Sequence, residues 1–260
     1  MSMGLQIYPL TGIGEVEADT CLTDLLLTAL QGAEVALQQG DVLVVAQKIV
    51  SKAENRYRNL NQVTPSAEAL ELADLTHKDA RLVELVLQES TAIVRSCPGV
   101  LIVRHHSGCV MANAGIDASN LRRSDVGEQV LLLPKDADGS ALQLHETLLA
   151  ATGASVGIVI ADSFGRPWRN GVTNVAIRAA GFPALLDRRN EPDRAGRHLQ
   201  VTEVAVGDLL ASAAGLLMGE GSEGIPAALI RGLPARYQIG ANHDRSAHTL
   251  IRSPERDLFR

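Results

Sequence analysis

The sequence predicts a folded, soluble chain of mixed helices and strands, which forms either one large domain or two lobes that share a cleft. The first observation is size, because 260 residues with a hydrophobic content of 46% can bury a large core. The second is periodicity. Short apolar runs bounded by Gly, Pro or polar residues are interspersed with longer segments whose apolar residues recur at helical spacing.

Each element is predicted from its own stretch of sequence. Short apolar or alternating runs predict strands at residues 5–10, 41–46, 99–104, 156–162 and 227–230. Apolar residues at helical spacing predict helices at residues 23–37, 66–75, 79–88 and 202–218, and a polar turn followed by a helix is predicted at residues 136–151. Residues 172–181 fit a strand and a buried helix equally well, so their state is undecided.

Composition excludes several classes of function. The formal net charge of -6 argues against a broad nucleic-acid surface, and an aromatic content of 3% leaves few platforms for stacking bases. Cys21, Cys97 and Cys109 show no CxxC spacing, so neither a disulfide framework nor a thiolate zinc site is indicated. We find no secretory leader and no apolar stretch near the ~20 residues of a membrane span. A cytoplasmic protein without nucleic-acid or membrane partners is expected.

The strand at residues 156–162 ends in a carboxylate and a hydroxyl, Asp162 and Ser163, and is expected to open into a loop there. Gly165 and Pro167 then define the turn beyond it. Oxygen ligands of this kind suit a hard divalent cation. The alternative is that Asp162 and Ser163 only cap the following turn.

A second carboxylate, Asp117, lies in a stretch of small residues and could share a ligand with Asn120. The alternative is an Asx turn in which Asp117 binds its own backbone. His105 and His106 follow a predicted strand, but adjacent strand residues point to opposite faces, which favours hydrogen-bonded or surface histidines over a joint metal site.

Two lysines, Lys48 and Lys52, lie four residues apart at the end of a predicted buried element. Both could be ordinary solvated lysines, or both could bind an anion. Arg188, Arg189, Arg194, Arg197 and His198 lie in a polar loop, which is either simply solvated or a lid that binds an acidic substrate.

The segment from Gly219 to Gly224 has the GxGxxG pattern. A dinucleotide-binding fingerprint follows a strand and opens a helix, whereas this segment follows a predicted helix and precedes a strand, so a Rossmann site is rejected. The sequence also contains no GxxxxGK[ST] motif, which excludes a P-loop. Glu220 and Glu223 would repel a polyphosphate unless cations mediate.

Together these loops present carboxylates (Asp117, Asp162 and Glu220), hydroxyls and two lysines. This inventory suits divalent ions that bridge a polyphosphate, and metal-assisted phosphoryl transfer is the reaction class that it favours. Spacing alone does not show whether the loops meet in space.

Four motifs along the chain match one known family in the expected order. They lie at residues 45–54, 112–120, 161–167 and 218–226. Together they resemble the coenzyme F420-0 gamma-glutamyl ligase family over nearly the whole chain, residues 1–260. The resemblance implies a two-lobed α+β fold in an intertwined homodimer. It also implies a GTP-dependent ligase that adds L-glutamate to the terminal carboxylate of F420-0, and then to the γ-carboxylate of F420-1, through an acyl phosphate with release of GDP and phosphate.

The resemblance further implies the residues of the site. The metal ligands would be Asp117, Asp162, Ser163 and Glu220, and the catalytic residues Asp117, Asp162 and Lys52. The nucleotide contacts would be Ile13, Gly14, Glu15, Val16, Gln47, Lys48, Lys52, Asn120, Met218, Gly219, Glu220, Gly221, Ser222, Glu223, Gly224 and Ile225. The ions would be Mg²⁺ or Mn²⁺, with two ions per site and K⁺ as further candidates.

The chain departs from the family pattern at a few positions, which puts its substrate range in question. Arg178 stands where the family commonly has Gly, Asn55 replaces another Gly, and residues 18–22 lack the usual Gly-Asp-Asp-Leu. The same scaffold could therefore ligate glutamate to a different acidic acceptor, or the protein could bind metal and nucleotide without turnover. No nitroreductase-like extension follows, so a second redox activity is not expected.

Overall fold

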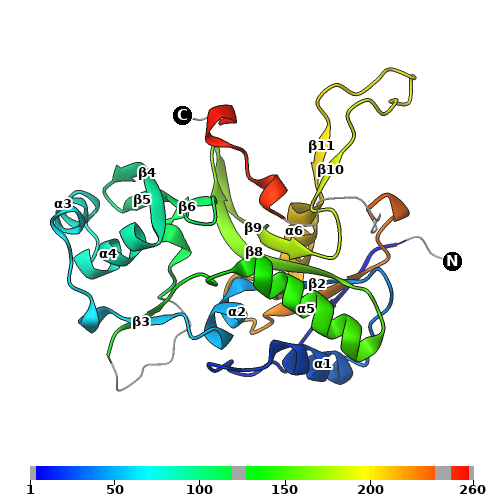
Figure 1. Cartoon of the computed structure of the whole chain (residues 1–260), viewed down its shortest axis with the longest axis horizontal. Helices are drawn as coiled ribbons and strands as arrows, with labels where there is room; N and C mark the ends of the chain where they lie inside the picture. Colours follow the sequence, from blue (N-terminus) through cyan, green and yellow to red (C-terminus); the bar gives the residue numbers. More distant parts are fainter. Residues whose placement is uncertain (1–3, 119–126, 238–246, 258–260) are drawn as a thin grey trace.

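The computed structural model describes residues 4–118, 127–237 and 247–257. Its centre is a five-stranded sheet with the strand order β1-β12-β2-β8-β9 (Figure 1). Strands β2 and β8 are parallel, whereas the other neighbours in this sheet are antiparallel. The strands are β1 (Gln6–Pro9), β2 (Val42–Ala46), β8 (Gly157–Arg166), β9 (Arg169–Ala180) and β12 (Ala227–Arg231).

Alternating side chains of this sheet build two apolar layers, because successive residues of a strand face opposite sides. In β2, Leu43 and Val45 belong to one buried cluster and Val42 and Val44 to another. Helices α1 (Leu22–Gly32), α2 (Gln47–Ala53) and α5 (Ala137–Thr152) contribute to the first cluster, and α6 (Val206–Met218) contributes to the second. The sheet is thus covered on both faces.

A second group of elements lies beside the main sheet and has an apolar cluster of its own (Figure 1). It comprises α3 (Ala67–Thr76), α4 (Ala80–Gln88) and an antiparallel sheet of β4 (Ser90–Cys97), β5 (Val100–His105) and β6 (Val110–Ala112). The short strands β3 (Tyr57–Asn59) and β7 (Gln129–Leu131) pair with each other, and the 3₁₀ turns η1 (Leu60–Gln62) and η2 (Asn113–Gly115) complete the group. The α+β prediction is confirmed.

The predicted helices at residues 66–75 and 79–88 are confirmed, and each begins after a residue whose side chain caps it, Ser66 and Asp79. Two other helices are shorter than predicted. Helix α1 ends five residues early because the chain turns at Glu34, whose φ is 57°. Helix α6 starts four residues late because Glu203–Ala205 forms strand β11. The undecided residues 172–181 belong almost entirely to strand β9.

A long two-stranded arm, residues 185–205, projects from the body of the molecule (Figure 1). Strand β10 (Leu185–Asp187) pairs with β11 at its base. Ion pairs within the arm join Arg188 to Glu191, Arg189 to Asp187 and Arg197 to Asp193. The arm points away from the sheet, so the predicted lid does not cover a site in this chain. Three more 3₁₀ turns, η3 (Ala235–Tyr237), η4 (Ala247–Leu250) and η5 (Pro254–Arg256), lie near the C-terminus.

In the described part of the chain, every helix is too short or too polar to traverse a lipid bilayer. The intertwined dimer and the lobe boundaries stay predictions.

Candidate active site

The candidate site lies where the parallel strands β2 and β8 end. Ala46 pairs with Ala161 at the last step of their register, so Gln47 and Asp162 follow side by side. A cavity of about 590 Å³ opens at this edge. Ligands commonly bind beyond the carboxyl ends of parallel strands, because loops from neighbouring strands converge there.

The cavity brings together most of the residues predicted to contact a nucleotide. Those that line it are Ile13, Gly14, Glu15, Val16, Gln47, Lys48, Lys52, Met218, Gly219, Glu220, Gly221, Ser222, Gly224 and Ile225. Glu223 is absent from the lining because its carboxylate folds back and accepts a hydrogen bond from the backbone N–H of Gly221 (2.8 Å). Asn120 lies outside the described residues.

Helix α2 begins directly after β2 and presents both lysines to the cavity, because residues four apart share one face of a helix. Lys48 Nζ lies 2.6 Å from Asp117 Oδ2, and Lys52 Nζ lies 2.5 Å from Glu15 Oε1. The Lys52 side chain is only 9% exposed, so the alternative of a solvated surface lysine is wrong for Lys52. The carboxylate of Asp117 pairs with Lys48, so Asp117 lies next to the site, although it is not among the residues that line the cavity.

Glu220 is held in place by two side chains from the β8–β9 hairpin. Ser163 Oγ donates to Glu220 Oε2 (2.6 Å), and Asn174 Nδ2 donates to Glu220 Oε1 (2.7 Å). Ser163 and Asn174 are direct cross-strand partners and so face the same side of the sheet. Sequence reasoning missed Asn174 because the segment around it had no assigned state. Its amide among apolar residues was the only available signal.

The hairpin itself corrects one prediction. Strand β8 does not end at Asp162 but continues to Arg166, and the chain reverses at Pro167 and Trp168 before β9. Asp162 and Ser163 therefore lie within a paired strand rather than in a loop, because β9 extends the ladder as far as Arg169. The two side chains point to opposite faces of the strand, yet both residues line the cavity.

Asp162 shows that the predicted acids share one electrostatic environment. Burial raises the pKa of its carboxyl to about 6, Lys48 lowers it, and the nearby Asp117 and Glu220 each raise it. The three carboxylates come from β8, from the loop after β6 and from the loop after α6. The fold therefore brings the three predicted acids close together, which their spacing in the sequence alone could not show.

This raised pKa predicts a pH-dependent loss of stability that Asp162→Asn removes. The folded carboxyl keeps its proton up to about pH 6 and the unfolded one only to about 3.8, so stability falls as pH rises through that window. The wild type should lose on the order of 3 kcal/mol relative to Asp162→Asn between pH 4 and pH 7 without divalent metal. Urea unfolding of both proteins across that range measures the difference. Parallel pH profiles would show that Asp162 ionises normally.

The donor set fits a hard divalent cation. Glu15, Asp162 and Glu220 place three carboxylates at the cavity with the ammonium groups of Lys48 and Lys52, and a fourth, that of Asp117, pairs with Lys48 without lining the cavity. Within the described ranges, no three His, Cys, Asp or Glu side chains are already close enough to hold a metal. Mg²⁺ is usually bound by one or two carboxylates together with substrate phosphates, so this arrangement suits ions that arrive with a polyphosphate.

The glycine-rich loop follows helix α6 and precedes strand β12, which confirms that it is not a Rossmann fingerprint. Gly219 has φ 73° and ψ 178°, a conformation that only glycine adopts readily. A Cβ at this position would lie 2.2 Å from the carboxyl carbon of Glu223. The loop therefore needs glycine here for both conformation and space.

Gly219→Ala should lower the free energy of unfolding by about 1–3 kcal/mol from backbone strain, with a further loss from the contact with Glu223. Gly224→Ala is the matched control, because Gly224 also has a positive φ (67°) but meets nothing within 4 Å. Chemical denaturation of both variants separates the two effects. Equal losses of unfolding free energy in the two variants would mean that the close approach of the new Cβ to Glu223 adds nothing to the destabilisation.

The adjacent histidines are hydrogen-bonded, as the sequence favoured. His105 Nδ1 accepts from the backbone N–H of Ser107 (2.9 Å), and His106 Nε2 lies 2.8 Å from the carbonyl of Gln88. His105 is buried and His106 is exposed. Neither lines the cavity at Asp162.

Comparisons with known proteins extend over nearly the whole chain. The family model for F420-0:Gamma-glutamyl ligase matches residues 12–232. The chain is 45% identical over 234 residues to the coenzyme F420:L-glutamate ligase of Methanopyrus kandleri, covering 90% of this chain and 91% of that protein. It is 41% identical to the protein of the same name from Methanothermobacter thermautotrophicus, covering 99% of this chain and 100% of the relative. A Halobacterium salinarum relative of that name is 38% identical, with coverage of 98% and 96%.

Proposed function

The chain belongs to the F420-0:gamma-glutamyl ligase family, and from that premise we propose that it is a GTP-dependent ligase. It adds L-glutamate through its amine to the terminal carboxylate of F420-0, and then to the γ-carboxylate of F420-1. The observation that carries the proposal is similarity over nearly the full chain to proteins named coenzyme F420:L-glutamate ligase. The cavity at Asp162 supports it, because acids and lysines suited to a metal-bound polyphosphate line it together.

The proposed chemistry follows from the poor reactivity of a carboxylate. Its oxygen first attacks the γ-phosphorus of GTP, which breaks the bond to GDP and forms an acyl phosphate. The unprotonated glutamate amine then attacks the acyl carbon, an amide bond forms as the nitrogen loses a proton, and phosphate leaves with the electron pair of the broken C–O bond. Such transfers need positioning and charge stabilisation more than a protein nucleophile.

The protein's own residues supply the positioning. Lys48 and Lys52 face the cavity from one side of α2 and would place positive charge beside the phosphates. Residues 13–16, 218–222, 224 and 225 also line the cavity and would contact the nucleotide. Because both lysines are paired with acids, phosphate binding would exchange these ion pairs for contacts with the nucleotide.

Asp117, Asp162, Ser163 and Glu220 would hold the divalent ions, Mg²⁺ or Mn²⁺, with two per site and K⁺ as a further candidate. When bound, such ions neutralise charge on the transferring phosphoryl group and align the two oxygens of the displacement. Ser163 and Asn174 keep Glu220 at the rim of the cavity in a fixed orientation.

Mass spectrometry tests the proposal directly. Purified protein with GTP, Mg²⁺ or Mn²⁺, L-glutamate and F420-0 should give products heavier by one or more glutamyl units, together with GDP and phosphate. If F420-0 gives no product but another acidic acceptor drives glutamate-dependent GDP release, the acceptor is wrong and the reaction class stands. Tight GTP binding without turnover on any acceptor would refute the ligase assignment and favour a non-catalytic role.

A homodimer, which the family resemblance implies, and a cytoplasmic location, which the cysteine pattern predicts, complete the proposal. Light scattering of the purified protein tests the first, because a dimer has twice the chain mass of 27.6 kDa.

A further inference from the structure

The β8–β9 hairpin extends beyond the proposed nucleotide site and ends in an exposed tip, residues 166–169. Ser163 lines the main cavity, and Arg166 lies three residues further along β8, about 10 Å at the usual rise of a strand. The chain turns over at Pro167 and Trp168, between the paired residues Arg166 and Arg169. One strand therefore connects the tip to the site, although the tip is not part of the cavity lining.

Trp168 combines an unfavourable backbone conformation with an unfavourable environment. Its φ is 63°, in the left-handed region that a bulky side chain rarely adopts, and 88% of the residue is exposed. It is also the only tryptophan of the sequence. A glycine at this position would relieve the backbone strain and remove the exposed apolar surface. Strain and exposure of this kind are concentrated where a side chain contacts a ligand or a partner.

The positive charges of the tip are not balanced by acids. Arg166 and Arg169 are direct cross-strand partners, and like charges in such positions are destabilising. Among the residues that the structure describes, no Asp or Glu forms an ion pair with either of them. Arg166 donates from Nη2 to the carbonyl of Asn170, which is neutral (3.4 Å). An anion bound between the two guanidinium groups would relieve their repulsion.

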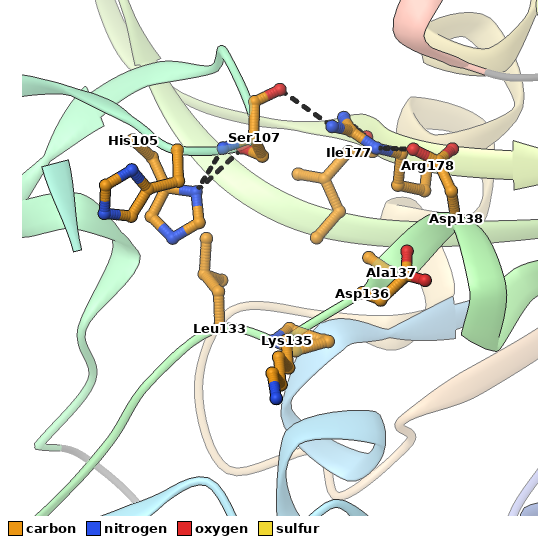
Figure 2. A pocket seen from close by; sticks show the side chains of 11 residues that line it. His105, Ser107, Leu133, Lys135, Asp136, Ala137, Asp138, Ile177 and Arg178 are labelled. Atoms are coloured by element: carbon orange, nitrogen blue, oxygen red, sulfur yellow. Dashed lines mark hydrogen bonds and ion pairs between the residues drawn. The ribbon is translucent and has the colours of Figure 1, made fainter. Parts of the chain in front are cut away.

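The third arginine of the hairpin, Arg178, provides a contrast. It lies in the wall of a second cavity of about 140 Å³ and is only 5% exposed. Figure 2 shows that it donates from Nε to Asp138 Oδ2 (2.6 Å) and from Nη2 to the carbonyl of Ser107 (2.7 Å). The charge of Arg178 is thus balanced inside the protein, so the anion-binding capacity of the hairpin is at its tip.

We propose that the tip binds a planar aromatic ligand that carries an anionic group, with the ring stacked on Trp168 and the anion held by Arg166 and Arg169. An indole offers a large flat surface for stacking, and guanidinium groups pair with phosphate or carboxylate in a bidentate geometry.

Within the ligase reaction this ligand is the acceptor, F420-0, and in that respect the inference rests on the proposed function. F420-0 has a planar, flavin-like ring and a phosphate ester. The distance of about 10 Å between Ser163 and the tip lets the ring lie on Trp168 while the terminal carboxylate lies in the main cavity. The tip would therefore select the acceptor without taking part in phosphoryl transfer.

Calorimetric titration with F420-0, and separately with riboflavin 5′-phosphate as a probe with a similar ring and charge, tests the assignment without turnover. Trp168→Leu and the double variant Arg166→Gln/Arg169→Gln should each weaken binding at least about tenfold, because each loses a stacking or charge-assisted contact. Affinity for GTP should stay within about twofold of wild type.

Matched controls replace equally exposed side chains elsewhere. Val201→Ala removes an apolar side chain that is 84% exposed on the arm, and Arg95→Gln removes an exposed charge from β4. Both should bind F420-0 and riboflavin 5′-phosphate like the wild type. Trp168→Gly suits the left-handed turn and should bind as weakly as Trp168→Leu, so a folding defect in the leucine variant would not obscure the result.

The fluorescence of the single tryptophan reports on the tip directly, and saturable quenching by the bound ligand is expected. Binding of either compound that weakens in the tip variants but not in the controls supports the inference, even if no glutamyl product forms and the proposed function fails. Unchanged binding in the tip variants overturns it, even if glutamyl products form. The absence of wild-type binding to both compounds, or an unquenched tryptophan at saturation, also overturns it.

The competing occupant of the tip is a second copy of this chain. Light scattering of the wild type and of Trp168→Gly distinguishes the two. The same oligomeric state in both proteins is expected. A wild-type dimer that dissociates in Trp168→Gly would assign the tip to a contact between subunits and overturn the inference.

Discussion

Asp162→Asn is expected to abolish metal-dependent ligation while the fold stays intact. The substitution keeps the shape of the side chain but removes the charge that faces Lys48 and the other two acids. Loss of one ligating charge at a metal-assisted phosphoryl transfer costs several kcal/mol, so kcat/KM should fall at least about 100-fold. Steady-state assays at saturating Mg²⁺ measure the loss, and circular dichroism checks the fold.

Asp74→Asn is the matched control for this variant, because Asp74 is exposed on α3 and distant from the cavity lining. It should keep the wild-type rate. Raising the Mn²⁺ concentration should restore part of the activity of Asp162→Asn if the remaining ligands still hold an ion. A wild-type rate in Asp162→Asn would remove Asp162 from the mechanism.

Lys52→Met should affect both stability and nucleotide binding. It removes the ion pair of Glu15 with Lys52, and breaking such a mostly buried pair costs about 3–5 kcal/mol, less here because Glu15 is 29% exposed. It also removes one of the two cations of α2 that face the cavity. Affinity for GTP should therefore fall at least about tenfold, since charge-assisted contacts to phosphate contribute about 1.5–3 kcal/mol each.

A double variant separates the two effects of Lys52. Glu15→Gln combined with Lys52→Met no longer leaves a lone charge, so the unfolding free energy should recover, whereas GTP affinity should remain low. Calorimetry and urea unfolding of the two single variants and the double variant complete the cycle. If the double variant binds GTP like the wild type, Lys52 serves only to pair with Glu15.

Local sequence patterns predicted much of the fold. The apolar run of β2 and the amphipathic segments of α3 and α4 were identified because burial imposes a periodicity that is visible in one short window. The early end of α1 was missed because it depends on a left-handed turn at Glu34, a residue type that does not signal one. The late start of α6 was missed because pairing with β10 competes with helix formation there.

The site was harder to predict, because its geometry arises from pairing between distant strands. The parallel register that places Ala46 beside Ala161 brings Lys48 to Asp162, and no local pattern encodes that register. The family resemblance supplied the residues but not their contacts. Asn174 and the cavity at Arg178 went unnoticed because each depends on what faces it across a strand or from another element.

The central claim is that Asp117, Asp162 and Glu220 meet around divalent ions that carry the phosphates of GTP. A crystal structure with Mn²⁺ and a non-hydrolysable GTP analogue, phased with the anomalous signal of manganese, tests it most directly. We expect manganese peaks within bonding distance of these carboxylates and of the nucleotide's phosphate oxygens. Manganese and nucleotide bound elsewhere, with the three carboxylates uncoordinated, would contradict the account.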